Sequence, residues 1–532
     1  MAGPGDNLAA RLLGDAFERG WEARVVLREG DRTWTYAQLA EQAARVATVL
    51  RTLRVSRGER VALLMRDTLD AAAALLGTIH MGAVAVPLSE LARPNDLRNY
   101  LNHSQAACAI VDEELEPSLD EIRAEVPGVR EILCTGARSA GERDYFAAVR
   151  AAAPAPEAAT VGEDDIALLL YSAGGGPERP RGVPHRHITP FLAFESFARG
   201  VIGMTEEDRV LSVVRLSTAY GLGVGLLFPL IAGAESTLLP QQPHSSTLFW
   251  VIEKLQPTVL FATPSVYGQL ARDAEAGGRN RPLARLRSCV SGAEGMPPKL
   301  VPRIRDVLGA DVTVGYGLTE AFQFVLAGPA DGSRPGACGR PVPGVDARVV
   351  GESGSPVGAD EIGTLQLQAP TLLRSYWEEQ PDQQFADGWF TTRDRFMLDA
   401  NGNYFHCGRV DDLFKVSGKW VSPGEVERAL LAHEAVWECA VIGADDEDGL
   451  IKPLAFVVPN IGWDAGPPLE AELREYVKSE LAPYKYPRWI EFVSRLPKGP
   501  SGKILRYKLR PPGRPRRAET LTGNEGGGSS SS

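Results

Sequence analysis

Hydrophobic and polar positions between residues 60 and 90 alternate in blocks that are typical of a parallel sheet covered by helices. The pattern predicts a strand at 60–65, an apolar helix at 69–81 and a second strand at 82–87. Strand-like runs followed by glycine-rich or polar turns and helical spacing recur at 166–171, 209–214, 236–239, 258–261, 286–290 and 312–314. We therefore expect an α/β fold, with one large body of stacked doubly wound sheets up to about residue 410.

The texture of the sequence changes after residue 410. Helical spacing at 423–433 and 469–481 alternates with short apolar runs at 440–442 and 454–458, which predicts a small, mobile α+β domain. The segment from residue 511 onward, PPGRPRRAETLTGNEGGGSSSS, has almost no apolar residues and is expected to be disordered. The predicted domains are thus 1–410, 411–510 and a tail at 511–532.

Composition narrows the possible partners of the chain. With 532 residues and 44% hydrophobic content, more than one core is expected. The net charge of -11, with 57 Lys+Arg scattered among 68 Asp+Glu, argues against a nucleic-acid partner. Six widely separated cysteines without a CxxC pair favour a reducing cytoplasm over a zinc site or a disulfide scaffold. The apolar run at 69–88 contains Asp70 and His80, so a helix and strand of a globular protein are expected there rather than a membrane span.

Two glycine-containing segments are candidates for nucleotide binding. The segment YSAGGGPERPRG at 171–182 follows a strand, and its backbone amides could approach phosphate oxygens; its candidate residues are Ser172, Gly174, Gly175, Gly176 and Arg181. The segment VGYGLTE at 314–320 would suit a base stacked on Tyr316, phosphate at Thr319 and Mg²⁺ at Glu320. Taken alone, the first segment is equally compatible with an ordinary surface loop, and the second favours a tight turn with a surface glutamate.

Two later segments carry charged residues suited to the same ligand. In DGWFTTRD at 387–394 and CGRVDDLFKVSG at 407–418, Asp394 could accept ribose hydroxyls and Arg409 could bind phosphate. Near the end of the chain, PKGPSGKILR at 497–506 places Lys503 in a glycine-rich loop, where its charge could stabilise a transferring phosphoryl group. Each charge in isolation would be read as a solvated turn residue.

In combination, YGLTE, GWFTTRD, CGRVDDLFKVSG and PKGPSGKILR resemble the signature motifs of the acyl-adenylate-forming (ANL) superfamily, in their order and separations. The resemblance extends from about residue 35 to residue 509. STAYGLG at 217–223 and APYKYPRWIEF at 482–492 are similar to benzoate-CoA ligases and their hydroxybenzoate and aminobenzoate (anthranilate) relatives. The resemblance implies a two-domain acyl-CoA ligase that uses ATP, Mg²⁺ and coenzyme A on an aromatic acid.

The resemblance also assigns expected roles to individual residues. Tyr316 would lie against adenine with Ala293 and Glu294 nearby, Thr319 would meet the α-phosphate, Glu320 the metal, Asp394 the ribose and Arg409 the ribose and phosphate. Asp411 would be the hinge about which the small domain turns, and Lys503 would act in the adenylation step. Lys415 and Gly418 would bind the cofactor, with Gly418 lining the pantetheine path. The aryl pocket would be formed by Ala219, Tyr220, Gly315 and Gln323.

Departures from the family pattern concentrate on ATP handling. Gly175 and Gly176 replace a hydroxyl pair of the usual phosphate loop, Arg181 replaces its lysine, and Arg393 replaces the glycine of Thr-Gly-Asp. Losing two phosphate contacts, at about 1.5–3 kcal/mol each, could slow adenylation by roughly two to four orders of magnitude.

Three hypotheses follow from this mixture of preserved and altered motifs. The first is an ATP-dependent ligase that joins an aromatic acid to coenzyme A or to an acyl carrier protein. The second is an ATP-independent aroyltransferase that moves an aroyl group from its coenzyme A thioester to a carrier protein. The third is a non-catalytic binding scaffold. The ring substituent and the oligomeric state, a homodimer included, stay open.

Overall fold

The computed structural model describes residues 6–509 apart from 137–141, 156, 173–179, 242, 278–284, 331–335, 379–383, 410–411, 413, 417–418, 447–448, 461 and 499–503. The chain divides into two compact units, residues 1–411 with 498–503 and residues 412–497 with 504–532. The domain limits expected from the sequence stay a prediction, and the predicted tail lies outside the described residues.

One sheet of the first unit has the strand order β16-β15-β14-β13-β12-β10-β11-β1-β2. The pairs from β14 to β1 are parallel, whereas β2, β15 and β16 add antiparallel edges. The strands are β1 (Val25–Glu29), β2 (Arg32–Thr35), β10 (Arg209–Ser212), β11 (Glu235–Leu238), β12 (Val259–Ala262), β13 (Ser288–Ser291), β14 (Asp311–Gly317), β15 (Phe324–Pro329) and β16 (Arg340–Pro341).

A second sheet has the order β7-β6-β5-β3-β4-β8-β9, in which the chain winds outward in both directions from β3. Its pairs are parallel except for the β8–β9 hairpin. The strands are β3 (Arg60–Leu64), β4 (Val84–Pro87), β5 (Ala106–Val111), β6 (Glu131–Cys134), β7 (Arg143–Asp144), β8 (Ile166–Ser172) and β9 (Arg181–Arg186). The two sheets confirm the predicted α/β class.

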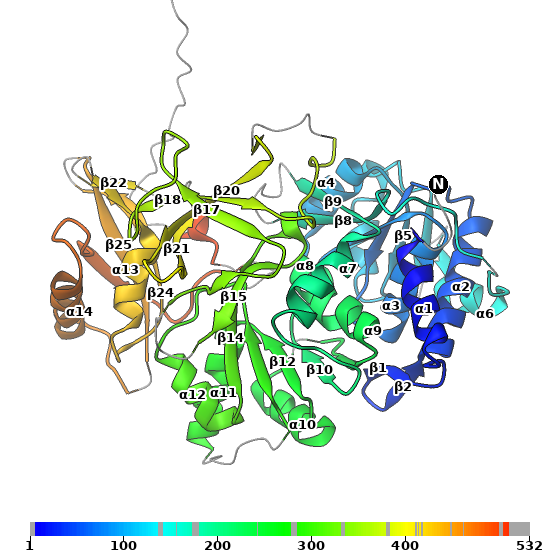
Figure 1. Ribbon diagram of the computed structural model, residues 1–532, viewed down its shortest axis with the longest axis horizontal. Coiled ribbons are helices and arrows are strands. Elements are labelled where there is room, and N and C mark those ends of the chain that lie inside the picture. The colour runs from blue at the N-terminus through cyan, green and yellow to red at the C-terminus, as the bar shows by residue number, and fades with distance from the viewer. Residues whose placement is uncertain are drawn as a thin grey trace, which may run out of the picture. The chain divides into compact units, whose positions relative to one another are not determined.

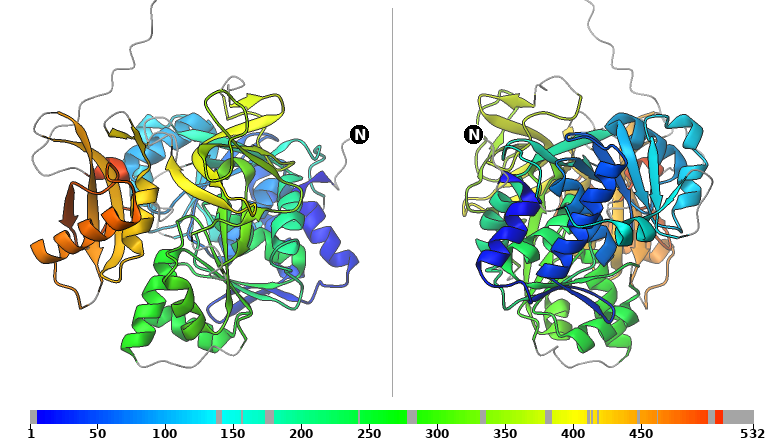
Figure 2. Two further views of the ribbon diagram at one scale, coloured as in Figure 1. Left: turned by 60° about the vertical axis from the view of Figure 1, so that its left-hand side comes forward. Right: turned by 90° about the vertical axis from the view of Figure 1, so that its right-hand side faces the viewer.

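Helices join and cover these sheets. They are α1 (Leu8–Glu18), α2 (Tyr36–Thr52), α3 (Leu69–His80), α4 (Pro94–Ser104), α5 (Glu116–Asp120), η2 (Arg123–Glu125), α6 (Tyr145–Ala151), α7 (Thr189–Ala193), η3 (Phe194–Arg199), α8 (Ala219–Leu222), η4 (Gly223–Leu227), α9 (Phe228–Ala232), α10 (Ser245–Leu255), α11 (Pro264–Ala276), α12 (Leu300–Leu308) and η5 (Thr319–Ala321). Figure 1 shows α11 and α12 together beside β14, and the right-hand view of Figure 2 shows the blue N-terminal helices next to the cyan strands of the second sheet.

Helix α3 illustrates how an apolar run is buried between layers. The hydroxyl of Thr68 accepts from the amide of Ala71 and caps the first turn. The helix then packs on β1 of one sheet and on β3 and β4 of the other, so it is buried on more than one face. Within the described part of the chain, we find no helix long and apolar enough to cross a membrane.

A third sheet, not anticipated from the sequence, corrects the expectation that doubly wound structure continues to residue 410. It is antiparallel, with the order β17-β18-β20-β19 and with β21 paired to β20. Alternate residues of β18 are buried, which is the period expected when one face of an antiparallel sheet is covered. The strands are β17 (Asp346–Val350), β18 (Ile362–Gln368), β19 (Phe385–Ala386), β20 (Trp389–Leu398) and β21 (Tyr404–Arg409).

The second unit has its own core around a sheet of order β24-β25-β26 and a separate β22–β23 pair. Its elements are β22 (Phe414–Val416), β23 (Lys419–Val421), α13 (Pro423–Leu431), β24 (Val436–Asp445), β25 (Ile451–Pro459), α14 (Pro467–Glu480), β26 (Trp489–Phe492) and η7 (Arg506–Lys508). Arg506 ties the end of the unit to α13, because its Nη2 donates to both carboxylate oxygens of Glu427 at 2.8 Å.

Candidate active site

The carboxylate of Asp394, on β20 of the β20–β21 hairpin, is held by side chains from two other strands, β14 and β21. The hydroxyl of Tyr316 donates to Asp394 Oδ2 at 2.7 Å, and His406 Nε2 lies 3.1 Å from Asp394 Oδ1. Arg409 is the register partner of Asp394 across the hairpin. A carboxylate has about four lone-pair positions, so these two partners leave one position on each oxygen for a vicinal diol.

The surroundings of Asp394 keep it ionised. Burial acts to raise the pKa of this carboxyl, but the hydrogen bonds from His406 and Tyr316 and the charge of Arg409 outweigh it and lower the pKa to about 2. About a fifth of the side chain (21%) remains exposed. Burial and the neighbouring Asp394 raise the pKa of Tyr316 well above its ordinary value, so its hydroxyl stays a donor.

The segment between β14 and β15 presents the next predicted residues. β14 ends at Gly317, one residue past Tyr316, and Thr319 and Glu320 are the first two residues of the short η5 turn. Glu320 Oε1 accepts from the hydroxyl of Tyr376 at 3.0 Å, and the Glu320 carbonyl accepts from the amide of Leu373 at 2.8 Å. Glu320 follows Tyr316 in the same segment, and its charge adds to that of Asp394 in raising the pKa of the Tyr316 hydroxyl.

The β8–β9 hairpin supplies the candidate phosphate segment. Ser172, the last residue of β8, and Arg181, the first residue of β9, lie opposite each other where the strands meet the connecting segment. Gly174, Gly175 and Gly176 lie outside the described residues. The guanidinium of Arg181 lies 4.3 Å from the centre of the Tyr376 ring, a cation–π contact. Tyr376 therefore links the arginine that replaces the family lysine to the carboxylate of Glu320.

The turn after β13 contains the two residues expected near adenine. Ala293 has φ of +70°, a left-handed conformation that costs a non-glycine residue free energy and is often found at functional sites. Glu294 Oε2 accepts from the hydroxyl of Ser265 at 2.7 Å, which holds this carboxylate against the start of α11.

The predicted aryl-pocket residues gather around one aromatic ring. Phe324 lies 4.9 Å from the ring of Tyr220 (centroid to centroid), and a Cβ on Gly315 would come within 2.4 Å of the Phe324 ring. Gln323 donates from Nε2 to the carbonyl oxygens of Ala219 and Tyr220 at 3.5 and 3.4 Å. Gly315 therefore leaves room for the Phe324 ring, and all four predicted pocket residues come together.

Helical geometry around the pocket is irregular as well. Helix α8 continues into η4, a π-helical turn, and such turns are frequent at functional sites. Phe322, next to Gln323, has φ of +66°, so a second strained residue borders this region.

Several predicted residues are not brought together by the described structure. Asp411, Gly418 and Lys503 lie outside it. Lys415 is exposed on β22 of the second unit, where it pairs in register with Trp420. Arg393 is exposed on β20, one residue before Asp394, so the two side chains point to opposite faces of the strand. The roles of all the predicted site residues stay predictions.

Three residues of the site were not predicted from the sequence. They are His406, Tyr376 and Phe324. His406 had a usable signal, because DANGN at 399–403 is a hairpin turn sequence that would have set Asp394 and His406 on paired strands. Asp399 closes that turn by accepting from the amides of Asn401 and Asn403, both at 2.8 Å. Tyr376 and Phe324 had none, since an isolated aromatic residue gives no indication of its distant partner.

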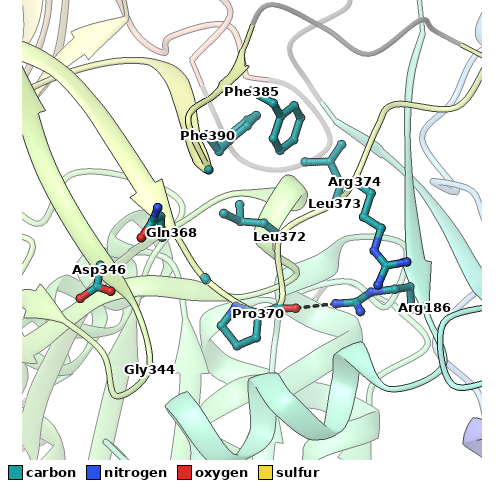
Figure 3. Close-up of a pocket in the computed structure, with 12 residues that line it drawn as sticks. Arg186, Gly344, Asp346, Gln368, Pro370, Leu372, Leu373, Arg374, Phe385 and Phe390 are labelled. Carbon is teal, nitrogen blue, oxygen red and sulfur yellow. Dashed lines mark hydrogen bonds between the residues drawn. The ribbon is translucent and has the colours of Figure 1, made fainter. Parts of the chain in front are cut away.

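A surface hollow lies beside this cluster. It has a volume of about 670 Å³ and is lined by Arg186, Gly344, Asp346, Gln368, Ala369, Pro370, Leu372, Leu373, Arg374, Phe385, Gly388 and Phe390. Figure 3 shows the two arginines on one side and the two phenylalanines across from Pro370, with Arg186 donating to the Pro370 carbonyl. Arg186 and Arg374 both pair with Asp164, at 2.7 and 2.9 Å. The predicted site residues do not line this hollow.

Two sequence families match the chain in the order of its two units. The AMP-binding enzyme family matches residues 15–377, and the AMP-binding enzyme C-terminal domain matches residues 425–503. The chain therefore belongs to the AMP-binding enzyme family, and the predicted superfamily resemblance is confirmed.

Individual relatives are similar over almost the whole length. The benzoate–CoA ligase of Thauera aromatica is 36% identical, with 95% of each chain covered. The crystal structure of a benzoate CoA ligase from Burkholderia xenovorans LB400 is 34% identical, with a TM-score of 0.87 over 95% of this chain and 100% of that one. The anthranilate CoA ligase AuaEII, solved in complex with anthranoyl-AMP, is 34% identical, with a TM-score of 0.86 over 93% and 96%.

Proposed function

We propose that this protein activates an aromatic carboxylic acid with ATP as an acyl-adenylate. It then transfers the acyl group to the thiol of coenzyme A or of carrier-protein phosphopantetheine. The single observation that carries the proposal is that Tyr316 and Asp394, predicted from two separate motifs, are joined by a hydrogen bond in a chain related over its length to aryl-CoA ligases.

The cluster suits the nucleotide half of this reaction. Asp394 is ionised and keeps one acceptor position on each oxygen, which fits the 2′- and 3′-hydroxyls of a ribose. Arg409, Thr319 and Arg181 are the proposed phosphate contacts, with Ser172 and the glycines at 174–176. Ala293 and Glu294 are proposed to border the adenine.

Glu320 is the proposed Mg²⁺ ligand. Mg²⁺ is commonly bound by one or two carboxylates together with substrate phosphates, so a single protein carboxylate at this position is sufficient. When bound, the metal would neutralise phosphate charge. Glu320 and its donor Tyr376 would hold that site beside Thr319.

The motifs at 407–418 and 497–506 supply the remaining proposed roles. Lys503 is proposed to stabilise the adenylation transition state and Asp411 to be the hinge of the small domain. Lys415 is proposed to bind the cofactor, and Gly418 to line the pantetheine path. Lys503→Ala should lower adenylation by about 10²–10³, as loss of one preorganised charge contact does elsewhere. Transfer from a preformed aroyl thioester should survive. Equal loss of both activities would contradict the assigned role.

The proposal is tested by aryl-acid-dependent exchange of pyrophosphate into ATP, with benzoate, aminobenzoates and hydroxybenzoates. Exchange should require the aromatic acid and should be absent with an aliphatic acid of equal size. Folded protein that gives no exchange and no AMP with any member of this panel would refute adenylation.

A second candidate function is an ATP-independent aroyltransferase from aroyl-CoA to a carrier protein. The observation that favours it is the altered phosphate segment at 171–182, in which Gly175 and Gly176 stand where the family has a hydroxyl pair and Arg181 stands where it has a lysine. Mixing aroyl-CoA with a holo carrier protein in the absence of ATP should then increase the mass of the carrier by one aroyl group. An unchanged carrier mass would count against this candidate.

A further inference from the structure

The side-chain amide of Gln323 is buried at the start of β15. Only 4% of this residue is exposed, and it follows Phe322, whose backbone is held at φ of +66°. Gly223 makes room for the amide, because a Cβ at that position would lie 2.3 Å from Gln323 Nε2. The amide of Gln323 is therefore enclosed between the strained Phe322 and the backbone of Gly223.

The orientation of this amide is determined by its neighbours. Nε2 donates to the carbonyl oxygens of Ala219 and Tyr220. Exchanging the two amide atoms would place Oε1 against the same carbonyl oxygens, which are acceptors only. Oε1 is thus fixed as an acceptor.

Gln323 Oε1 has no hydrogen-bond partner within the part of the chain that the structure describes. Buried polar atoms in proteins are almost always paired, and one left unpaired is destabilising. An atom of this kind, next to the pocket residues Ala219 and Tyr220, indicates that a ligand supplies the missing donor.

Two other polar side chains beside the pocket, those of Thr218 and Tyr220, already have partners. The hydroxyl of Thr218 donates to the Arg215 carbonyl at 2.9 Å and accepts from the Gly221 amide at 3.0 Å, so it caps α8. The hydroxyl of Tyr220 lies 3.4 Å from the Val290 carbonyl. Gln323 Oε1 has no such partner in the described part of the chain, and it is the acceptor that we assign to a ring substituent.

We infer that Gln323 selects an aromatic acid whose ring carries an amino or hydroxyl group, which donates a hydrogen bond to Gln323 Oε1. The inference rests on the proposed function, because it concerns the acyl pocket of that reaction. The aromatic walls, Tyr220 and Phe324, would hold the ring itself, while Gln323 distinguishes a donor from an apolar group of the same size.

The test compares kcat/KM for pairs of acids that differ only in the donor. Each aminobenzoate and hydroxybenzoate isomer is compared with the methylbenzoate substituted at the same carbon, and with benzoate. At one ring position the donor-bearing acid should be preferred by about 10- to 100-fold, the range expected when a buried acceptor loses its partner. Equal kcat/KM within each pair would overturn the inference and leave the proposed function intact.

Gln323→Met keeps the volume of the side chain and removes the acceptor. The preference for the donor-bearing acid should fall to within about threefold of unity, whereas Thr218→Val should lower the melting temperature and keep the preference. An unchanged preference in Gln323→Met would overturn the inference. If Gln323→Met does not fold, the wild-type comparison of matched acids decides alone. If the wild type neither activates nor transfers any aromatic acyl group, the proposed function itself fails.

Discussion

Replacing His406 by phenylalanine tests whether the Asp394 cluster is organised for a ribose. Phenylalanine can keep the ring contacts of His406 with Tyr316 (5.7 Å between centroids, 24° between planes) and with Phe396 (5.2 Å), but it cannot donate to Asp394. The surroundings of Asp394 lower its pKa from 3.8 to about 2, which corresponds to about 2.5 kcal/mol of net stabilisation of the carboxylate. Burial opposes this shift, so the contributions of His406, Tyr316 and Arg409 together exceed this amount, and we assign at least about 1 kcal/mol to the His406 hydrogen bond.

His406→Phe should therefore weaken AMP and ATP binding about fivefold, because the carboxylate loses one of the donors that orient it. Isothermal titration calorimetry with AMP measures this directly. His406→Gln, which keeps a donor, is the matched control and should stay within about twofold of the wild type. The difference should vanish with 2′,3′-dideoxy-ATP, which lacks both hydroxyls. Unchanged or tighter binding of AMP to His406→Phe would show that His406 competes with the ribose instead of positioning Asp394.

Two further predictions concern stability. Gly315→Ala should destabilise the protein by about 1–3 kcal/mol, because the new methyl group would lie 2.4 Å from the Phe324 ring. In thermal melts, the double variant Gly315→Ala with Phe324→Leu should recover part of this loss. Equal stability of Gly315→Ala and the wild type would contradict the close contact between Gly315 and Phe324. The lowered pKa of Asp394 means that its ionised form stabilises the fold above about pH 4, and this contribution is lost as the pH falls towards 2. Asp394→Asn should thus cost about 2 kcal/mol in urea unfolding at pH 7 and clearly less at pH 3, and a cost independent of pH would contradict the assignment.

Local patterns in the sequence predicted much of the first unit. The strand at β3 and the helix at α3 agree with prediction to within one residue, because buried strands and helices have distinct apolar spacings. The following strand, expected from residue 82, begins at Val84 because Gly82 adopts φ of +82° in the turn. The antiparallel sheet at β17–β21 was missed, since its strands are half-buried and carry many polar residues that were interpreted as motif loops.

The candidate site was predictable as a set of motifs but not as a set of contacts. Asp394, Tyr316 and Glu320 could be assigned from their segments. The hairpin turn at 399–403 was the signal for His406, the donor to Asp394, whereas Tyr376, the donor to Glu320, comes from a position that no local pattern connects to its partner. The orphan acceptor of Gln323 could not be predicted either, because it depends on which carbonyl groups happen to face the amide. Such pairings depend on tertiary packing, on which local periodicity carries no information.

The central claim is tested most directly by incubating the protein with an aminobenzoate or hydroxybenzoate, ATP, Mg²⁺ and coenzyme A, and measuring AMP and aroyl thioester together. Our account predicts that AMP and aroyl-CoA form in equal amounts and that both depend on the aromatic acid. Transfer of an aroyl group from aroyl-CoA to a carrier protein, with no AMP formed under any of these conditions, would contradict it.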